Sequence, residues 1–529
     1  MTSKQFDVIV VGAGFSGMYL LHLLRSRGHK VRVLERGSDV GGTWYWNRYP
    51  GARCDVESME YSYQFSEELQ QDWDWSERYA PQPEILQYAN HVADRFDLRR
   101  DIQFETNVSA AAYQEDTARW RIETAEGEVY DAKFFIMATG CLSSTNKPQF
   151  KGADSFKGSV YHTGNWPHEP VDFTGKRVAV IGTGSSAIQC IPQIAAQAAH
   201  LTVFQRTANY AVPARNGPLD PDLRDAIKAN YPEFRANAKQ VRNGLQYPPN
   251  DVATMSVSPQ EREAEFRFRW DRGGVSFAGA FNDLLLSAEA NEAAANFVRD
   301  RIRETVNDPK VAELLCPKSV IACKRLCVDI GYFETYNRPN VTLVDISEAP
   351  IEEFTPAGVK AHGEVAEVDA IVLATGFDAM TGALLGVDIR GRQGQTLREK
   401  WAAGPCTYLG LSTAGFPNFF MVTGPGSPSV LTNMLPSIEQ HVEWISDLLD
   451  ATLARGARAV EPERQAEEAW VEHVNALAGR TLYPTCNSWY LGANVPGKPR
   501  VFMPYLGFPT YVAKCDVVAR NGYLGFAFT

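Results

Sequence analysis

Two glycine-rich motifs contain the residues whose types and spacing most clearly indicate chemistry. The first, GAGFSG, contains Gly12, Gly14 and Gly17 and matches G-x-G-x-x-G. It follows the apolar run FDVIVV, and residues 15–27 after it have helical spacing. In a strand-turn-helix unit, these glycines allow a tight turn, close approach of a pyrophosphate and close packing of the helix. The motif therefore predicts a dinucleotide site.

The residue that ends the next strand indicates which dinucleotide binds. The run VRVLE ends at Glu35, where a carboxylate can accept hydrogen bonds from both ribose hydroxyls. A carboxylate would repel a 2′-phosphate, so this first unit suits FAD. The alternative is a glycine-rich turn that arose by chance.

The second motif, GTGSSA, lies in the segment from Arg177 to Thr207 and repeats the same pattern, with Ala187 in the third glycine position. Its second strand ends in Gln205, Arg206 and Thr207 instead of an acid. Because a guanidinium can bind a 2′-phosphate bidentately, this unit is predicted to prefer NADPH to NADH. The alternative is that Arg206 is a solvated surface residue.

Two such units predict an α/β fold with two Rossmann-like dinucleotide-binding domains, for FAD and NADPH, and a helical insertion. The runs FFIMATG (134–140) and AIVLATGFD (370–378) are interpreted as closing strands, after which the chain crosses between domains. The predicted boundaries are 1–142 and 378–529 for the FAD domain, 143–215 and 322–377 for the NADP domain, and 216–321 for the insertion.

Composition excludes several functional classes. The net charge of −11 argues against a nucleic-acid or anionic-membrane surface. The sequence has no apolar run long enough to span a bilayer and no signal-peptide pattern, so we expect a cytoplasmic protein, either a monomer or at most a weak oligomer. The nine cysteines include no C-x-x-C pair. A disulfide reductase would need such a redox pair, and a simple oxidase would not need a second nucleotide site.

The stretch FKGSVYHTGNWP, between the two units, resembles the F-x-G-x-x-x-H-x-x-x-W-[PD] fingerprint of the Baeyer–Villiger monooxygenases. Its matching residues are Phe156, Gly158, His162, Trp166 and Pro167. The resemblance extends through GGTWYWNRYPGARCDVES, VFQRT, TGPGSPSVLTNM and NSWYLGAN, and is closest to the phenylacetone and steroid monooxygenases. A metal site at His162, with His168 and Asp172 nearby, is the alternative, but FAD and NADPH leave no role for a metal. We therefore interpret His162 as an anchor of an interdomain hinge.

The resemblance implies that one oxygen atom of O2 is inserted beside a ketone carbonyl, giving an ester or lactone through a C4a-peroxyflavin. The peroxide attacks only as an anion, so the site needs a permanent positive charge without a transferable proton, which an arginine supplies. By resemblance Arg325 has this role and Asp55 orients it. The alternatives are that Asp55 caps a turn and that Arg325 is a surface charge.

The resemblance also implies the residues that contact each cofactor. The predicted FAD residues are Gly12, Ala13, Gly14, Phe15, Ser16, Gly17, Glu35, Arg36, Thr43, Trp44, Tyr45, Trp46, Asp55, Tyr61, Val108 and Met434. The predicted NADP residues are Arg53, Cys54, Asp55, Thr183, Gly184, Ser185, Ser186, Gln189, Arg206, Thr207, Lys324, Arg325 and Trp489. A core position is the alternative for Trp489.

Two other functions remain open at this point. An N- or S-oxygenating flavin monooxygenase would share both nucleotide sites, although Trp166-Pro167 and Lys324-Arg325 argue against it. A catalytically silent FAD-binding redox sensor would show no ketone-stimulated NADPH oxidation. Substrate choice is expected to depend on residues 427–434 and 489–494, which do not by themselves identify the ketone.

Overall fold

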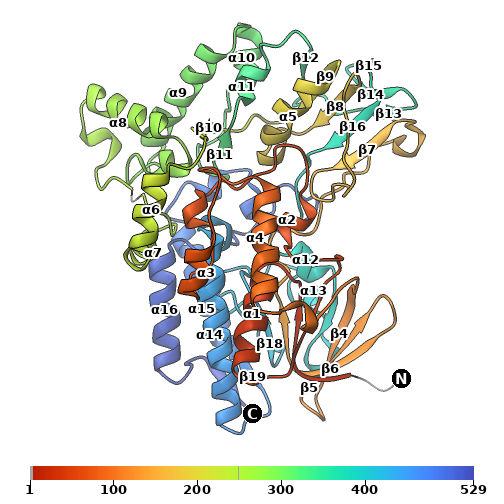
Figure 1. Cartoon of the computed structure of the whole chain (residues 1–529), viewed down its shortest axis with the longest axis vertical. Helices are drawn as coiled ribbons and strands as arrows, with labels where there is room; N and C mark the ends of the chain where they lie inside the picture. The colour runs from red at the N-terminus through yellow and green to blue at the C-terminus, as the bar shows by residue number, and fades with distance from the viewer. Residues whose placement is uncertain (1–3, 248) are drawn as a thin grey trace.

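A computed structural model describes residues 4–247 and 249–529 of the chain. Its strands form two large sheets, each built around one strand-helix-strand unit, and Figure 1 shows one sheet below the other. In the first unit, β1 (Lys4–Val11) pairs in parallel with β2 (Val31–Leu34), and α1 (Phe15–Ser26) connects them. In the second, β8 (Arg177–Ile181) pairs in parallel with β9 (His200–Gln205) through α5 (Ser185–Gln197). The predicted α/β fold with two dinucleotide-type units is confirmed.

The larger sheet contains the first unit and has the order β17-β4-β5-β6-β1-β2-β3, with β18 also paired to β6. The end of β6 is the FFIM run that was predicted to close the domain. It lies inside the sheet, because β6 pairs with β1 on one side and with β5 and then β18 on the other. The additional strands are β3 (Ile102–Gln103), β4 (Val108–Gln114), β5 (Arg119–Thr124), β6 (Val129–Met137), β17 (Asp388–Arg390) and β18 (Phe419–Met421).

The smaller sheet is parallel throughout, with the order β12-β9-β8-β16-β7. Its edge strand β7 (Ser159–His162) comes from the fingerprint stretch, which the sequence interpretation treated only as a hinge segment. That interpretation missed a strand, because four residues paired to a single neighbour leave almost no periodic signal. The sheet also contains β12 (Val341–Asp345) and β16 (Ala370–Leu373), and a meander of β13 (Glu353–Thr355), β14 (Gly358–Ala361) and β15 (Glu364–Glu367) precedes β16.

The helical insertion extends from the smaller sheet to the C-terminal helices. In Figure 1, α8 to α10 lie beside the upper sheet, whereas α6 and α7 extend downward and α7 packs against α16. Its helices are α6 (Pro221–Ala229), α7 (Tyr231–Gln240), α8 (Pro259–Arg272), α9 (Ala288–Thr305) and α10 (Pro309–Leu315). A short parallel pair, β10 (Ala211–Pro213) and β11 (Cys327–Asp329), connects both ends of the insertion.

The C-terminal segment returns to the larger sheet, where α14 packs against α1. Figure 1 shows α14 beside α1 in the lower half of the molecule. This segment contains α12 (Gly382–Leu385), α13 (Leu397–Lys400), α14 (Met434–Ala454), α15 (Arg464–Ala478), α16 (Phe508–Arg520), β19 (Val460–Pro462) and β20 (Phe526–Phe528). The other helices are α2 (Thr43–Trp46), α3 (Glu67–Asp72), α4 (Gln82–Arg95) and α11 (Tyr332–Thr335). Within the described part of the chain, no helix combines the length and apolar character that a membrane span needs.

The two crossings between the sheets lie side by side. The Asn146 amide donates to the Gly376 carbonyl at 2.9 Å, and the Asp378 amide donates to the Ser144 carbonyl at 2.8 Å. These antiparallel bonds make a paired connection between the sheets. The predicted domain boundaries at 142/143 and 377/378 fall in or next to this connection.

Candidate active site

The glycine loop of the first unit leaves backbone exposed where a pyrophosphate would approach. Gly12 has φ of +103°, and a Cβ there would lie 2.8 Å from the Ala138 carbonyl oxygen. A Cβ on Gly42 would lie 2.8 Å from the Gly14 Cα, so a side chain would fill the space between the two loops. These contacts explain why small residues are needed on both loops. The loop fits a bound dinucleotide.

Glu35 lies directly under this loop and is 5% exposed. Its Oε2 accepts from the Ala13 amide at 2.7 Å, and its Oε1 accepts from the Gly37 amide at 2.6 Å. The Glu35 carbonyl accepts from the Thr106 amide, two residues before Val108 at the start of β4. The carboxylate and Val108 therefore border the same region, in agreement with a ribose and base placed beside the loop.

An aromatic group from three separate segments lies next to the loop. Trp44 in α2 donates its Nε1–H to the Tyr61 hydroxyl at 3.2 Å, and Phe15 in α1 packs edge-on against Tyr61 with ring centres 5.9 Å apart. The Arg36 guanidinium lies over the Trp46 ring at 4.5 Å. Sequence resemblance predicted all five as FAD residues, and the fold brings Phe15 and Trp44 into contact with Tyr61 and Arg36 into contact with Trp46. A flat ring system stacks well on such a group, so these residues fit a flavin.

The second unit also forms an open turn, but the strand that follows it ends in exposed groups. Gly182 has φ of +117°, and the Thr183 hydroxyl donates to the Thr207 carbonyl at 2.8 Å. Arg206 is exposed at the end of β9. Burial and the nearby Arg206 charge both lower the pKa of Lys324. Arg206 and Lys324 are therefore electrostatic neighbours, a pair that fits the 2′-phosphate of NADP.

Arg325 and Asp55 meet although 270 residues separate them in sequence. The Arg325 Nη2 donates to Asp55 Oδ1 at 2.9 Å and its Nε donates to Oδ2, which makes a bidentate ion pair. The remaining Nη1 donates to the Val430 carbonyl at 2.7 Å. Burial opposes the charge on Arg325, but the Asp55 carboxylate outweighs burial and raises the arginine pKa. The guanidinium therefore stays protonated at every working pH.

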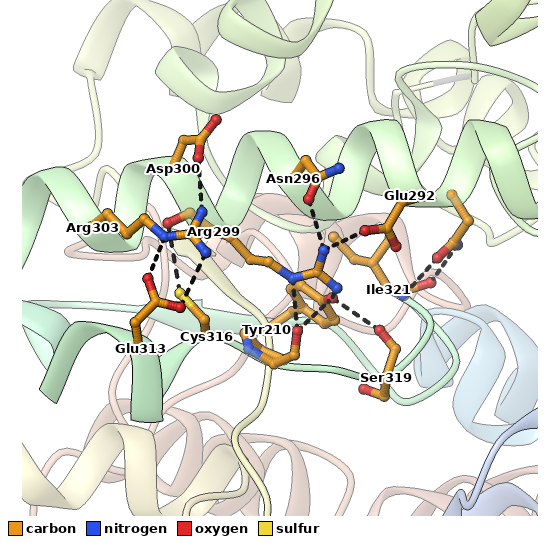
Figure 2. Close-up of polar contacts among 12 residues, drawn as sticks. Tyr210, Glu292, Asn296, Arg299, Asp300, Arg303, Glu313, Cys316, Ser319 and Ile321 are labelled. Carbon is orange, nitrogen blue, oxygen red and sulfur yellow. Dashed lines mark hydrogen bonds and ion pairs between the residues drawn. The ribbon is translucent and has the colours of Figure 1, made fainter. Parts of the chain in front are cut away.

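The segment that leads into Arg325 is held by helix α9. Arg299 donates to the Pro317 carbonyl at 2.8 Å and to the Tyr210 hydroxyl at 3.0 Å, and Tyr210 donates to the Ser319 carbonyl at 2.9 Å (Figure 2). Asn291 bonds both the amide and the carbonyl of Ile321. Sequence reasoning missed this support, because a charged helix looks like a solvated surface when its partners are unknown.

The turn after Ile321 is strained. Ala322 has φ of +63°, a conformation that costs a non-glycine residue about 1 kcal/mol or more. The bonds from α9 hold the chain on one side of this turn, and the Arg325–Asp55 pair holds it on the other. The direction of the Arg325 side chain is therefore fixed by tertiary contacts on both sides.

Two cavities flank the ion pair. The wall of the first is formed by Asp55, Val56, Glu57, Glu60, Tyr79, Asn243, Leu245, Tyr247, Arg272, Val275 and Ser276. The second is lined by Asn209, Tyr210, Ser319, Val320, Lys324, Arg325 and Leu326. The predicted NADP residues Lys324 and Arg325 line the second cavity, and Asp55 lines the first.

The first cavity has polar residues that sequence reasoning did not identify. Glu57 accepts from Arg272 at 2.7 Å and from Arg78 at 2.8 Å. Burial, with a contribution from Glu57, raises the pKa of Glu60 to about 8, so Glu60 is mostly protonated at neutral pH. No local signal marks these residues, because Glu57 and Glu60 resemble ordinary surface acids in a sequence.

Contacts between the two halves place further predicted NADP residues together. The Gln189 carboxamide in α5 accepts from the Tyr49 hydroxyl at 2.8 Å and donates to the Arg53 carbonyl at 3.1 Å. Trp166 donates its amide to the Trp46 carbonyl at 3.3 Å. The fingerprint tryptophan and Gln189 therefore both join the NADP-type half to the FAD-type half.

Both ring nitrogens of His162 make hydrogen-bond contacts at the paired connection between the two sheets. Its Nδ1 accepts from the Gly164 amide at 3.0 Å, and its Nε2 lies 3.1 Å from the Asn146 carbonyl and 3.2 Å from the Thr375 hydroxyl. Burial lowers the pKa of His162, so the ring is neutral. These contacts tie β7 to both crossings. Among residues 4–247 and 249–529, no cluster of three or more His, Cys, Asp or Glu could hold a metal.

The C-terminal loop lies on the same connection. Trp489 begins the short 3-10 helix η9 (Trp489–Leu491) and is half-buried. Asn494 donates to the Phe377 carbonyl at 2.6 Å, and the Lys498 ammonium bonds Asp378 Oδ1 at 2.5 Å. Met434 is the first residue of α14, four residues after Val430, whose carbonyl bonds Arg325.

Comparison with known proteins places this geometry in a family. The family described as pyridine nucleotide-disulphide oxidoreductase matches residues 9–247. A Baeyer–Villiger monooxygenase of Pseudooceanicola batsensis is 46% identical over 98% of this chain and 95% of its own length. A phenazine N-monooxygenase of Lysobacter antibioticus is 42% identical over 99% of this chain and 97% of its own. A solved steroid monooxygenase bound to NADP superimposes with a TM-score of 0.95 at 52% identity, covering 99% of both chains.

These matches run the length of the chain and agree with a fold that has two dinucleotide-type units facing one ion pair. The chain belongs to the Baeyer–Villiger monooxygenase family. It is an NADPH-dependent flavin monooxygenase with FAD as its second cofactor.

Proposed function

We propose that this protein inserts one oxygen atom of O2 beside the carbonyl of a ketone, and that Arg325 and Asp55 are the residues that carry this reaction. The observation that carries the proposal is the bidentate Arg325–Asp55 pair between two cavities. The raised pKa of Arg325 supports it, because the group supplies charge and cannot supply a proton.

The guanidinium stabilises negative charge that develops on the carbonyl oxygen of the reacting ketone. A preorganised donor of this kind contributes about 3 kcal/mol, or about a hundredfold in rate. Asp55 keeps the fork of Arg325 in one orientation, and the Val430 carbonyl fixes its third direction. When bound, FAD supplies the oxygen-transfer chemistry and NADPH supplies the hydride.

The cofactor contacts follow from the same arrangement. Gly12, Gly14 and Glu35 would hold the pyrophosphate and ribose of FAD, and Phe15, Trp44 and Tyr61 its ring system. Arg206, Thr207 and Lys324 would hold the 2′-phosphate of NADP.

The ketone would occupy the cavity that includes Asp55. Its wall combines apolar Val56, Leu245 and Val275 with the acids Glu57 and Glu60. We propose cyclic, aryl and steroid ketones as the substrate classes. The similarity to a steroid monooxygenase supports the largest of them.

The test is incubation of the FAD-loaded protein with NADPH, O2 and a panel of aryl, cyclic and steroid ketones. An ester or lactone one oxygen atom heavier than the ketone is expected by mass spectrometry, with ketone-stimulated NADPH oxidation. Because one relative is a phenazine N-monooxygenase, the panel includes an aromatic N-heterocycle. N-oxide formation without any ester would overturn the proposal.

A further inference from the structure

Tyr61, a predicted FAD contact, lies where the chain leaves regular structure. It directly follows the 3-10 helix η1 (Ser58–Glu60), and the stretch 61–66 is neither helix nor strand. Backbone groups in such a stretch depend on side chains or water for their hydrogen bonds. The orientation of Tyr61 therefore depends on the side chains that bond its neighbours in sequence.

Arg235, from helix α7 of the helical insertion, bonds both residues that flank Tyr61. Its Nη1 donates to the Glu60 carbonyl at 3.2 Å, and its Nη2 donates to the Ser62 hydroxyl at 2.6 Å. Its Nε donates to Gln70 Oε1 at 3.2 Å, in helix α3, which begins directly after the irregular stretch. All three nitrogens of one rigid group therefore bond at or beside the stretch that contains Tyr61.

The environment of Arg235 is unfavourable for a charge. The residue is 5% exposed, its guanidinium lies over the Tyr231 ring at 5.0 Å, and its three acceptors are all uncharged. Burial lowers the pKa of Arg235. A buried guanidinium on neutral acceptors contributes little net stability, because desolvation offsets its hydrogen bonds. Its planar fork nevertheless fixes the relative positions of the groups that it bonds.

The Glu60 carbonyl also connects this arrangement to the segment beside Arg325. The same oxygen accepts from Asn433 Nδ2 at 2.8 Å, and Asn433 is the N-cap of α14. Asn433 lies three residues after Val430, whose carbonyl bonds Arg325. One carbonyl oxygen therefore contacts both the helical insertion and the segment that holds Arg325.

We propose that Arg235 is a positioning residue of the flavin site, which sets the orientation of Tyr61 by bonding the residues on both sides of it. The insertion then acts on this site although none of the predicted FAD contacts lies in residues 216–321. The inference rests on the proposed function, in which Tyr61 is a contact of the FAD ring system. Without the fork, residues 60 and 62 can shift independently, and the contact of Tyr61 with Trp44 at 3.2 Å loosens.

The experiment measures the dissociation constant for FAD from the fluorescence of flavin released when the FAD-loaded protein is diluted, together with the visible spectrum of the bound flavin. Arg235→Met keeps an unbranched side chain and removes every donor. The dissociation constant should rise about three- to tenfold and the spectrum should shift. Arg235→Lys should not restore the parental values, because one ammonium group cannot bond both flanking residues as the fork does.

Two further variants separate the fork from the helix and from the charge. Lys239→Met removes an exposed charge one turn later on α7 and should leave the dissociation constant and the spectrum unchanged. Ser62→Ala removes one acceptor and keeps the buried arginine. It should raise the dissociation constant about two- to threefold, and it tests the contact even where Arg235→Met fails to fold.

A double-mutant cycle with Tyr61→Ala distinguishes positioning from a general loss of stability. If Arg235 acts through Tyr61, Arg235→Met should change the dissociation constant by less than about twofold when Tyr61 is already Ala. A general loss of stability would weaken FAD binding equally in both backgrounds.

Any of four results contradicts the proposal: parental FAD binding in Arg235→Met, parental binding in Ser62→Ala, full recovery in Arg235→Lys, or an undiminished effect in the Tyr61→Ala background. These readouts need no ketone. If the parent protein makes no ester but the variants behave as expected, the proposed function fails and the role of Arg235 stands.

Discussion

The two dinucleotide-type units have the same backbone design and opposite charge at the end of the second strand. In the first, the Glu35 carboxylate is buried under the glycine loop and accepts two backbone amides. In the second, Arg206 is exposed, and the half-buried Lys324 from a distant segment is its electrostatic neighbour. The glycine turn therefore leaves room for a pyrophosphate in both units. The residue at the end of the second strand distinguishes a ribose without a 2′-phosphate from one that carries it.

The two units also differ in how much of each site is preformed. Glu35 accepts from Ala13 in the glycine loop and from Gly37, two residues further along the chain. All these residues belong to one strand-helix-strand unit, so this unit assembles locally. The second unit depends on Lys324, which follows the whole helical insertion in sequence.

The largest effect is expected where the two units meet, at Arg325. Arg325→Lys keeps a charge but loses the fork and gains a transferable proton, so ester formation should fall about a hundredfold or more while NADPH oxidation continues. Product mass and NADPH consumption, measured together, check this. The control Arg177→Lys changes an arginine paired with exposed acids at the far end of β8. Ester formation at the parental rate in Arg325→Lys would remove this residue from the mechanism.

The next effect is expected at the strand end of the second unit. Arg206→Ala removes a charged donor to the 2′-phosphate, worth about 1.5–3 kcal/mol, so KM for NADPH should rise about 10- to 100-fold. KM for NADH should stay within about twofold, because NADH has no 2′-phosphate. Arg338→Ala changes another exposed arginine and should leave both values alone. Equal increases for both cofactors would contradict the charge difference between the units.

A smaller effect is expected at the strand end of the first unit. Glu35→Gln replaces a carboxylate with one carbonyl oxygen and an NH2 group, which cannot accept from the Ala13 and Gly37 amides together. The dissociation constant for FAD, followed by flavin fluorescence, should rise about tenfold. Glu364→Gln, an exposed position on β15, is the control. Unchanged FAD affinity would show that the loop alone holds the cofactor.

The smallest effect is a pH dependence at Lys324. Because burial and Arg206 lower its pKa, Lys324 loses its proton at a lower pH than an ordinary lysine. The protonated form binds phosphate, so KM for NADPH should rise several-fold as pH increases through this lowered pKa. Lys324→Arg should flatten the profile, because an arginine stays charged. A parental profile that is already flat from pH 7 to 10 would contradict a titrating Lys324.

Local patterns in the sequence predicted the parts of the fold that local physics controls. Each βαβ unit is visible because glycine positions, strand length and helical spacing lie within about 30 contiguous residues. Glu35 and Arg206 could be assigned on the same basis, since each directly follows a strand. The strand β7 escaped notice because it is short and lies on an edge, where the sequence has little reason to alternate.

The sequence by itself determined the fold class, the two nucleotide units, the opposite charges at their strand ends and, through the fingerprint, the family. Only the tertiary structure decided which distant groups meet. Asp55 and Arg325 are 270 residues apart, and Arg299 donates to a carbonyl beyond its own helix. No periodicity can encode such pairs, because they depend on how packed cores bring separate segments to one place.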